Sequence, residues 1–191
     1  MSGRRGLLIV ISGPSGVGKD TLIHRLLKRD PNLGKSVSFT TRSRRPDEVQ
    51  GVDYVFTSRE EFEKAQRDGL LLESAEYDGN LYATSATQVD ELRSAGRDTI
   101  LKIDVQGAEQ VRKLVPDALF IFIAPPSMED LERRLEKRQT ESARDIAARR
   151  EIAKTEMSYA PRYDHVVTND DVDRAADEVL RIIREARERQ T

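Results

Sequence analysis

The chain has 191 residues, 35% of them charged, and a formal net charge of -2 at pH 7. This length suffices for one well-buried core, and the near cancellation of charge leaves no overall positive field that would indicate a nucleic-acid partner. Because the sequence contains no cysteine, disulfide bonds and thiolate metal or redox chemistry are excluded.

The first predicted element is a buried strand in the apolar run Leu7–Ser12. This run is too short for the core of a signal peptide or for a membrane span. We therefore expect a cytoplasmic protein without a membrane partner.

A glycine-rich loop follows this strand. Its residues are Gly13, Pro14, Ser15, Gly16, Val17, Gly18, Lys19, Asp20 and Thr21. Apolar residues at helical spacing come next, at Leu22, Ile23, Leu26 and Leu27. A strand, a glycine-rich turn and a helix N-terminus together direct backbone N–H groups at an anion, and the lysine adds a point charge. The alternative is an ordinary strand-turn-helix junction, but motif and context together predict a phosphate-binding loop.

The pattern changes between residues 36 and 86. Stretches containing Tyr, Phe and Val predict short strands at Val52–Phe56 and Leu71–Ala75, and Glu60–Arg67 has helical spacing. This region is predicted to be a small mixed insert. Within it, Ser38–Glu48 combines three arginines with several hydroxyls. Arginine binds phosphate with two parallel hydrogen bonds, although a solvated charged loop is the alternative.

Apolar runs and helical patterns alternate in the rest of the chain. Strands are predicted at Thr99–Asp104, Leu119–Ala124 and His165–Asn169, and helices at Gln106–Leu114, Met128–Lys137 and Val172–Arg187. This alternation is typical of parallel strands joined by crossover helices, and so predicts a three-layer α/β core. The polar segment Arg138–Arg149 is a candidate lid over a phosphate site.

Taken together, these motifs resemble those of the guanylate kinase family of nucleoside-monophosphate kinases over nearly the whole chain. The matching elements are the phosphate loop, the Ser38–Glu48 segment continuing to Asp53-Tyr54, Gly79-Asn80-x-Tyr82-x-Thr84, Ile103-Asp104-x-Gln106-Gly107 and Arg138-x-Thr140-Glu141. The second of these is the most specific.

The resemblance implies a P-loop kinase core formed by residues 1–35 and 87–191, with a lid at 138–149 and a GMP-binding insert at 36–86. The whole would form a single guanylate-kinase-like unit. The implied reaction transfers the γ-phosphoryl group of ATP to GMP, and also to dGMP, giving ADP and GDP in purine nucleotide metabolism and GMP recycling. Mg²⁺ would accompany ATP.

The family pattern also implies the residues that bind GMP. Those expected at its phosphate are Arg42, Arg45, Tyr54 and Tyr82, with Glu48 supporting the arginines. Ser38, Glu73 and Thr84 would face the guanine, and Asp104 is expected in the same set. The chemistry of guanine agrees, because a carboxylate can accept hydrogen bonds from N1–H and the 2-amino group, which adenine lacks at these positions.

The implied ATP site consists of the loop residues Gly13 to Thr21 together with Arg134 and Asn169. Arg138 and Arg149 would bring charge from the lid. The expected catalytic residues are therefore Lys19, Arg42, Arg138 and Arg149, which align and neutralise the transferred group without a covalent intermediate.

Three residues depart from the family pattern. Asp20 replaces the Ser or Thr that usually follows the lysine, Lys102 stands where an acid is common, and Gln139 replaces a glycine of the lid. Asp20 is a candidate Mg²⁺ ligand, and the alternative is that it only caps the first helix.

Two other functions stay open at this point. One is a related kinase with a changed acceptor such as a sugar phosphate, against which the intact Ser38 to Tyr54 segment argues. The other is a non-catalytic binding module of the same fold, against which Lys19, Arg138 and Arg149 argue.

Overall fold

The computed structural model describes residues 4–77, 79–136 and 143–190. The chain divides into two compact units. Unit 1 consists of Met1–Ile9, Asn32–Lys102 and Gln106–Ala118, and unit 2 of Val10–Pro31, Ile103–Val105 and Leu119–Thr191. Each is described by itself.

In the described residues, the strands form two sheets. The five strands of the first, in sheet order, are β2 (Leu33–Lys35), β7 (Asp98–Lys102), β1 (Leu8–Ser12), β8 (Leu119–Ala124) and β9 (His165–Thr168). The four strands of the second, in sheet order, are β4 (Val55–Phe56), β3 (Phe39–Thr40), β6 (Asn80–Ser85) and β5 (Leu71–Tyr77). Strand β1 runs across the division between the units.

Unit 1 contains the parallel pair β2 and β7, in which Leu33 lies opposite Asp98. Helix α3 (Ala86–Ser94) packs against β7. Most of helix α4 (Val105–Leu114) also belongs to this unit, and its Gln110 side chain donates to the carbonyl oxygen of Ser74 on β5 at 2.7 Å.

The smaller sheet of unit 1 is mixed. Strand β3 pairs parallel with β4 and antiparallel with β6, and β5 and β6 pair antiparallel with Glu73 opposite Thr84. Helix α2 (Arg59–Arg67) follows β4 and begins with a capping box, in which Ser58 and Glu61 satisfy each other's backbone N–H groups. Of the predicted GMP-binding residues, Glu73, Tyr82 and Thr84 lie on strands of this sheet.

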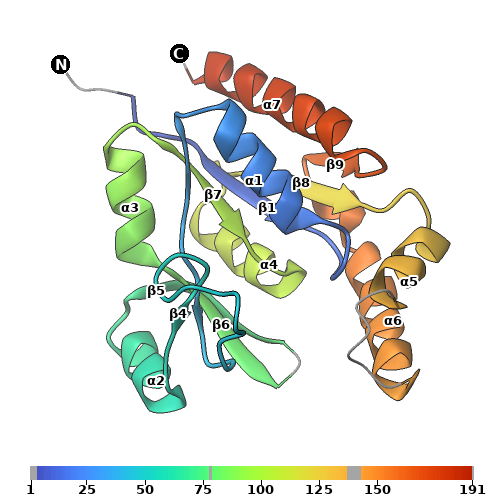
Figure 1. The fold of residues 1–191 in the computed structure, drawn as a ribbon. Coiled ribbons are helices and arrows are strands. Elements are labelled where there is room, and N and C mark those ends of the chain that lie inside the picture. The colour runs from blue at the N-terminus through green and yellow to red at the C-terminus, as the bar shows by residue number, and fades with distance from the viewer. Residues whose placement is uncertain (1–3, 78, 137–142, 191) are drawn as a thin grey trace. The chain divides into compact units, whose positions relative to one another are not determined.

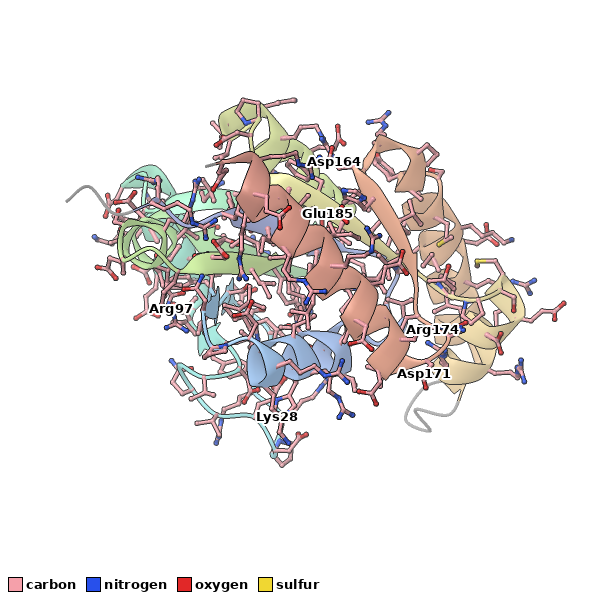
Figure 2. The ribbon with its side chains drawn as sticks, turned by 90° about the horizontal axis from the view of Figure 1, so that it is seen from above. Lys28, Arg97, Asp164, Asp171, Arg174 and Glu185 are labelled. Atoms are coloured by element: carbon pink, nitrogen blue, oxygen red, sulfur yellow. The ribbon has the colours of Figure 1, made fainter. Side chains whose placement is uncertain are left out.

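Unit 2 contains the parallel pair β8 and β9. Every residue of β8 is buried, as expected for a strand covered on both faces. Helix α1 (Lys19–Arg29) lies beside helix α7 (Val172–Arg189) (Figure 1). In Figure 2, α7 runs from the labelled Asp171 and Arg174 toward Glu185, and α1 carries the labelled Lys28. The remaining elements of this unit are helices α5 (Met128–Glu136) and α6 (Ala143–Met157) and the short 3₁₀ helix η1 (Ala160–Arg162).

The α/β class and the parallel sheet are confirmed, and the apolar runs predicted β1, β8 and β9 to within one residue at each end. Two predicted strands were too long. Strand β7 ends at Lys102 rather than Asp104, and β4 starts only at Val55 because Gly51, at φ 76°, and Val52 form a hydrogen-bonded turn. Of the candidate lid, residues 143–149 form the start of α6, and residues 138–142 lie outside the described residues. The division into a core and a GMP-binding insert stays a prediction.

No helix in the described ranges is both long and apolar enough to cross a membrane.

Candidate active site

The phosphate loop of unit 2 begins with a close backbone contact. Gly13 has φ 145°, and a Cβ atom at this residue would lie 2.2 Å from the carbonyl oxygen of Ile123 on β8. Gly18, at φ 97°, is the N-cap of α1, and a Cβ there would lie 2.7 Å from Nδ2 of Asn169. Both positions therefore favour glycine. The two glycines let the backbone adopt the conformation that brings N–H groups together at the start of α1.

Lys19 is the first residue of α1, and its side chain turns back over the loop. Its Nζ atom donates to the carbonyl oxygens of Gly13 at 2.5 Å and Pro14 at 3.0 Å. These bonds hold the ammonium group at the loop, where a terminal phosphate of a nucleotide would meet it.

Two side chains donate hydrogen bonds to the loop at the carbonyl oxygen of Val17. Asn169, which is buried, donates to it at 2.7 Å, and Arg134 of α5 donates to it at 3.1 Å. Arg134 also donates to the carbonyl oxygen of Asn169 at 3.0 Å. Both side chains that were predicted beside the ATP site therefore contact the loop.

A buried carboxylate that the sequence reasoning did not include also contacts the loop. Glu156 of α6 is 6% exposed and accepts a hydrogen bond from the backbone N–H of Ser15 at 3.3 Å. Burial raises the pKa of Glu156 above its usual value, and the charge of Lys19 and the Ser15 N–H oppose this only in part. One feature of the sequence could have indicated that Glu156 is buried. It stands three residues after Ala153, residues three apart share one helix face, and Ala153 is buried.

Asp20 is exposed and is the second residue of α1, one position after Lys19, and Thr21 follows it, also exposed. Gly18 rather than Asp20 occupies the N-cap position. A carboxylate in the first turn is nevertheless favourable, because it interacts with the positive end of the helix dipole. Within the described residues, no group of three or more His, Asp or Glu side chains could hold a metal ion by itself.

The predicted guanine-facing side chains lie in the smaller sheet of unit 1. Glu73 on β5 is 5% exposed, and its Oε1 atom accepts a hydrogen bond of 2.6 Å from the Thr84 hydroxyl on the neighbouring strand β6. Ser38, just before β3, is also buried, and its carbonyl oxygen accepts from the backbone N–H of Val55. A buried carboxylate with a fixed hydroxyl beside it can accept two N–H donors of a bound base.

The basic segment of unit 1 is organised by Glu48. This carboxylate accepts a hydrogen bond of 2.6 Å from the Arg42 guanidinium and one of 2.8 Å from the backbone N–H of Arg45. Burial raises the pKa of Glu48, but these two hydrogen bonds outweigh burial, so that its pKa lies below the usual value. Glu48 therefore stays ionised and holds the Arg42 side chain in place.

Two tyrosines lie next to this arginine. The Arg42 guanidinium carbon is 5.5 Å from the centre of the Tyr54 ring, and the rings of Tyr54 and Tyr82 meet edge to face at 6.1 Å. Arg45 is exposed at the same turn. The structure thus brings together the residues predicted for the GMP phosphate.

Lys102, at the end of β7, adds a cation to this group. Its Nζ atom donates to the Tyr54 hydroxyl at 3.0 Å and lies 5.1 Å from the centre of the Tyr54 ring. The sequence marked Lys102 as unusual but gave it no role.

Three predicted site residues remain. Asp104 belongs to unit 2, unlike the other residues of its predicted set. Arg138 lies outside the described residues, and Arg149 falls within α6, with its side chain outside the described ones. Their roles stay predictions.

Known guanylate kinases match this chain over nearly its whole length. The guanylate kinase family model matches residues 5–186. A guanylate kinase of Lactococcus lactis subsp. lactis is 50% identical over 179 residues, which cover 94% of this chain and 87% of that protein. One of Rubrobacter xylanophilus is 51% identical over 181 residues, 95% of each chain. The crystal structure of guanylate kinase from Anaplasma phagocytophilum matches with a TM-score of 0.81 at 36% identity, covering 97% of this chain and 88% of that chain.

Replacing Glu156 by Gln should change how stability depends on pH. Because burial raises the pKa of Glu156 in the folded state above the unfolded value of 4.5, protonation favours the folded protein. The free energy of unfolding of the parent should therefore fall as the pH rises from 4.5 through the raised folded value. The Gln variant cannot lose this proton, so its stability relative to the parent should increase over that window.

Urea unfolding of both proteins below pH 4.5 and at neutral pH measures this difference. Glu151→Gln is the control in the same helix, because the pKa of the exposed Glu151 is lowered by its hydrogen bond from Lys154. A Glu156→Gln difference that is the same at both pH values would contradict the argument.

Proposed function

Because this chain belongs to the guanylate kinase family, we propose which of its residues carry out the reaction and which acceptors it uses. The chain is an enzyme that transfers the γ-phosphoryl group of ATP to GMP, giving ADP and GDP. The observation that best supports the acceptor is the buried Glu73 carboxylate, paired with Thr84 at 2.6 Å.

Glu73 reads the guanine base. Its ionised carboxylate accepts hydrogen bonds from N1–H and the 2-amino group, while Thr84 holds the carboxylate and Ser38 supplies a hydroxyl near the base. Adenine has neither donor at these positions, so the buried carboxylate would lose the two hydrogen bonds that guanine supplies. Sites built on such polar contacts discriminate by roughly 10⁴-fold or more. The 2′-hydroxyl has no part in this recognition, so dGMP is also an acceptor.

The phosphate of GMP is bound by Arg42, Arg45, Tyr54 and Tyr82. Arg42 offers a planar pair of N–H donors that matches phosphate oxygens, and the 2.6 Å bond to Glu48 fixes the direction of its guanidinium group. Glu48 is therefore a positioning residue, because it acts through the arginine. The outcome is an oriented phosphate whose oxygen can attack the donor.

ATP is bound by the loop from Gly13 to Thr21. The N–H groups at the start of α1 and the Lys19 ammonium neutralise the developing charge on the transferred phosphoryl group. Arg134 and Asn169 keep the loop in shape through the Val17 carbonyl. Arg138 and Arg149 are proposed to add positive charge, and no covalent intermediate is required.

Asp20 fits a role as a Mg²⁺ ligand. It is an exposed carboxylate beside Lys19, and Mg²⁺ is commonly held by one or two carboxylates together with substrate phosphates and water. When bound, the ion would neutralise charge on the ATP phosphates. Without it, the Asp20 carboxylate would repel those phosphates.

A place in purine nucleotide metabolism, a cytoplasmic location and the absence of a nucleic-acid partner stay predictions from the sequence.

A coupled assay of ADP release tests the function. With GMP, dGMP, AMP, UMP and ribose phosphate as acceptors, we expect ADP from GMP and dGMP only. Lys19→Ala should lower kcat by roughly 10²–10³-fold, the usual effect of removing a group that stabilises transition-state charge. Lys28→Ala, on the exposed side of the same helix, is the matched control. Release of ADP with ribose phosphate as the acceptor, and with none of the nucleotides, would refute the assignment.

Glu73→Gln should raise the KM for GMP by about tenfold or more and leave the KM for ATP unchanged. The amide keeps one acceptor but presents its NH₂ group to a donor on the base, and a hydrogen bond to a charged group is worth about 1.5–3 kcal/mol. Glu76→Gln, exposed on the same strand, is the control. Equal changes in both KM values would show that Glu73 supports the fold instead.

Asp20→Ser should make ATP binding less dependent on Mg²⁺, because the serine neither repels phosphate nor binds the cation as strongly. Titration of ATP at several Mg²⁺ concentrations and fixed ionic strength measures this. Glu60→Gln, an exposed acid in the first turn of α2, controls for the loss of one negative charge at a helix start. Identical metal dependence in parent and Asp20→Ser would leave Asp20 with a helix-dipole role only.

A further inference from the structure

We propose that Lys102 is a positioning residue of the acceptor-phosphate site, which directs the Tyr54 hydroxyl hydrogen toward the phosphate of GMP. This inference rests on the proposed function. It concerns only residues of unit 1, and it gives a role to a side chain that the phosphate-binding set described above does not contain.

The position of Tyr54 is fixed on several sides. Its ring meets Phe56 at 5.8 Å and Tyr82 at 6.1 Å, and the Arg42 guanidinium lies 5.5 Å from the ring centre. Lys102 approaches both the ring, at 5.1 Å, and the hydroxyl, at 3.0 Å. The orientation of the hydroxyl is then decided by which neighbour donates to it.

The direction of the Lys102–Tyr54 hydrogen bond follows from the chemistry of the two groups. An ammonium group has three donors and no acceptor, whereas a phenol has one O–H donor and can also accept. Lys102 must therefore donate to the Tyr54 oxygen, which leaves the Tyr54 hydrogen for another acceptor. A phosphate oxygen is such an acceptor, and donation from a cation polarises the phenol and strengthens its own donation.

The charges of the site point the same way. Glu48 pairs with Arg42 at 2.6 Å, so that this pair contributes no net charge. Lys102 brings a positive charge to the side of Tyr54, at the end of β7. A phosphate bound at Tyr54 would therefore meet a lysine ammonium group in addition to the arginines, supplied by a different strand from the arginine segment.

Binding of GMP and of guanosine, measured by titration calorimetry without ATP, tests the role directly. Lys102→Met keeps the apolar stem and removes the charge, so the Kd for GMP should rise by about tenfold, as expected for loss of a charged hydrogen bond. The Kd for guanosine, which has no phosphate, should not change. Lys102→Arg should restore most of the GMP affinity, and Lys113→Met, an exposed lysine on α4, should have no effect.

A double-mutant cycle with Tyr54→Phe tests whether Lys102 acts through the hydroxyl. In the Tyr54→Phe background, Lys102→Met should weaken GMP by clearly less than in the parent, because coupled residues are not additive. An equal effect in both backgrounds, or an unchanged Kd for GMP in Lys102→Met, would overturn the proposal. If Lys102→Met does not fold, Lys102→Gln takes its place in the same cycle. A parent protein that binds neither GMP nor guanosine would refute the proposed acceptor site instead.

Discussion

The donor site depends on the contact between the backbone of Gly13 and the carbonyl of Ile123. A Cβ atom at Gly13 would lie 2.2 Å from this oxygen, and β8 is buried throughout and cannot retreat. The loop therefore leaves β1 at a fixed place and in a fixed direction. Lys19 donates to the Gly13 carbonyl, so the cation proposed to meet the phosphate is held at the same glycine. A backbone approach of this kind is more rigid than one made by side chains, because no rotamer can change it.

Two glutamates, Glu156 buried and Glu48 partly exposed, differ in the direction in which their pKa values are shifted. Glu48 receives hydrogen bonds from a guanidinium and a backbone N–H, and its pKa is lowered despite burial. Glu156 receives one long bond from Ser15, and burial raises its pKa. Burial opposes ionisation in both cases, and it prevails only for Glu156, which is more deeply buried and accepts fewer hydrogen bonds. The first arrangement stabilises an ionised group that orients an arginine, and the second disfavours the ionised form of a carboxyl group beside the phosphate loop.

Much of the fold was predictable from local sequence, because long apolar runs such as Leu119–Ala124 are buried wherever they occur. The short strands β2 and β3 were missed, since two or three residues carry no periodicity, and β6 was also missed. The first part of helix α6, residues 143–149, was predicted to belong to a polar lid, because its alanines and charged residues show no clear apolar face. The resemblance to the guanylate kinase family implied the side chains around Glu48 and Glu73. It could not predict the Ser15–Glu156 contact, which joins residues 141 apart in the sequence.

The hydrogen bonds to the Val17 carbonyl determine when, during synthesis of the chain, the loop can take its native structure. Their donors, Arg134 and Asn169, lie 117 and 152 residues further along the chain. During synthesis the glycine-rich loop leaves the ribosome long before these partners exist, and β8, against which Gly13 is seated, is also translated later. A nascent chain that ends before residue 169 carries the complete loop sequence but lacks the hydrogen bond from Asn169 to the Val17 carbonyl. The loop can therefore reach its full native structure for nucleotide binding only near the end of translation.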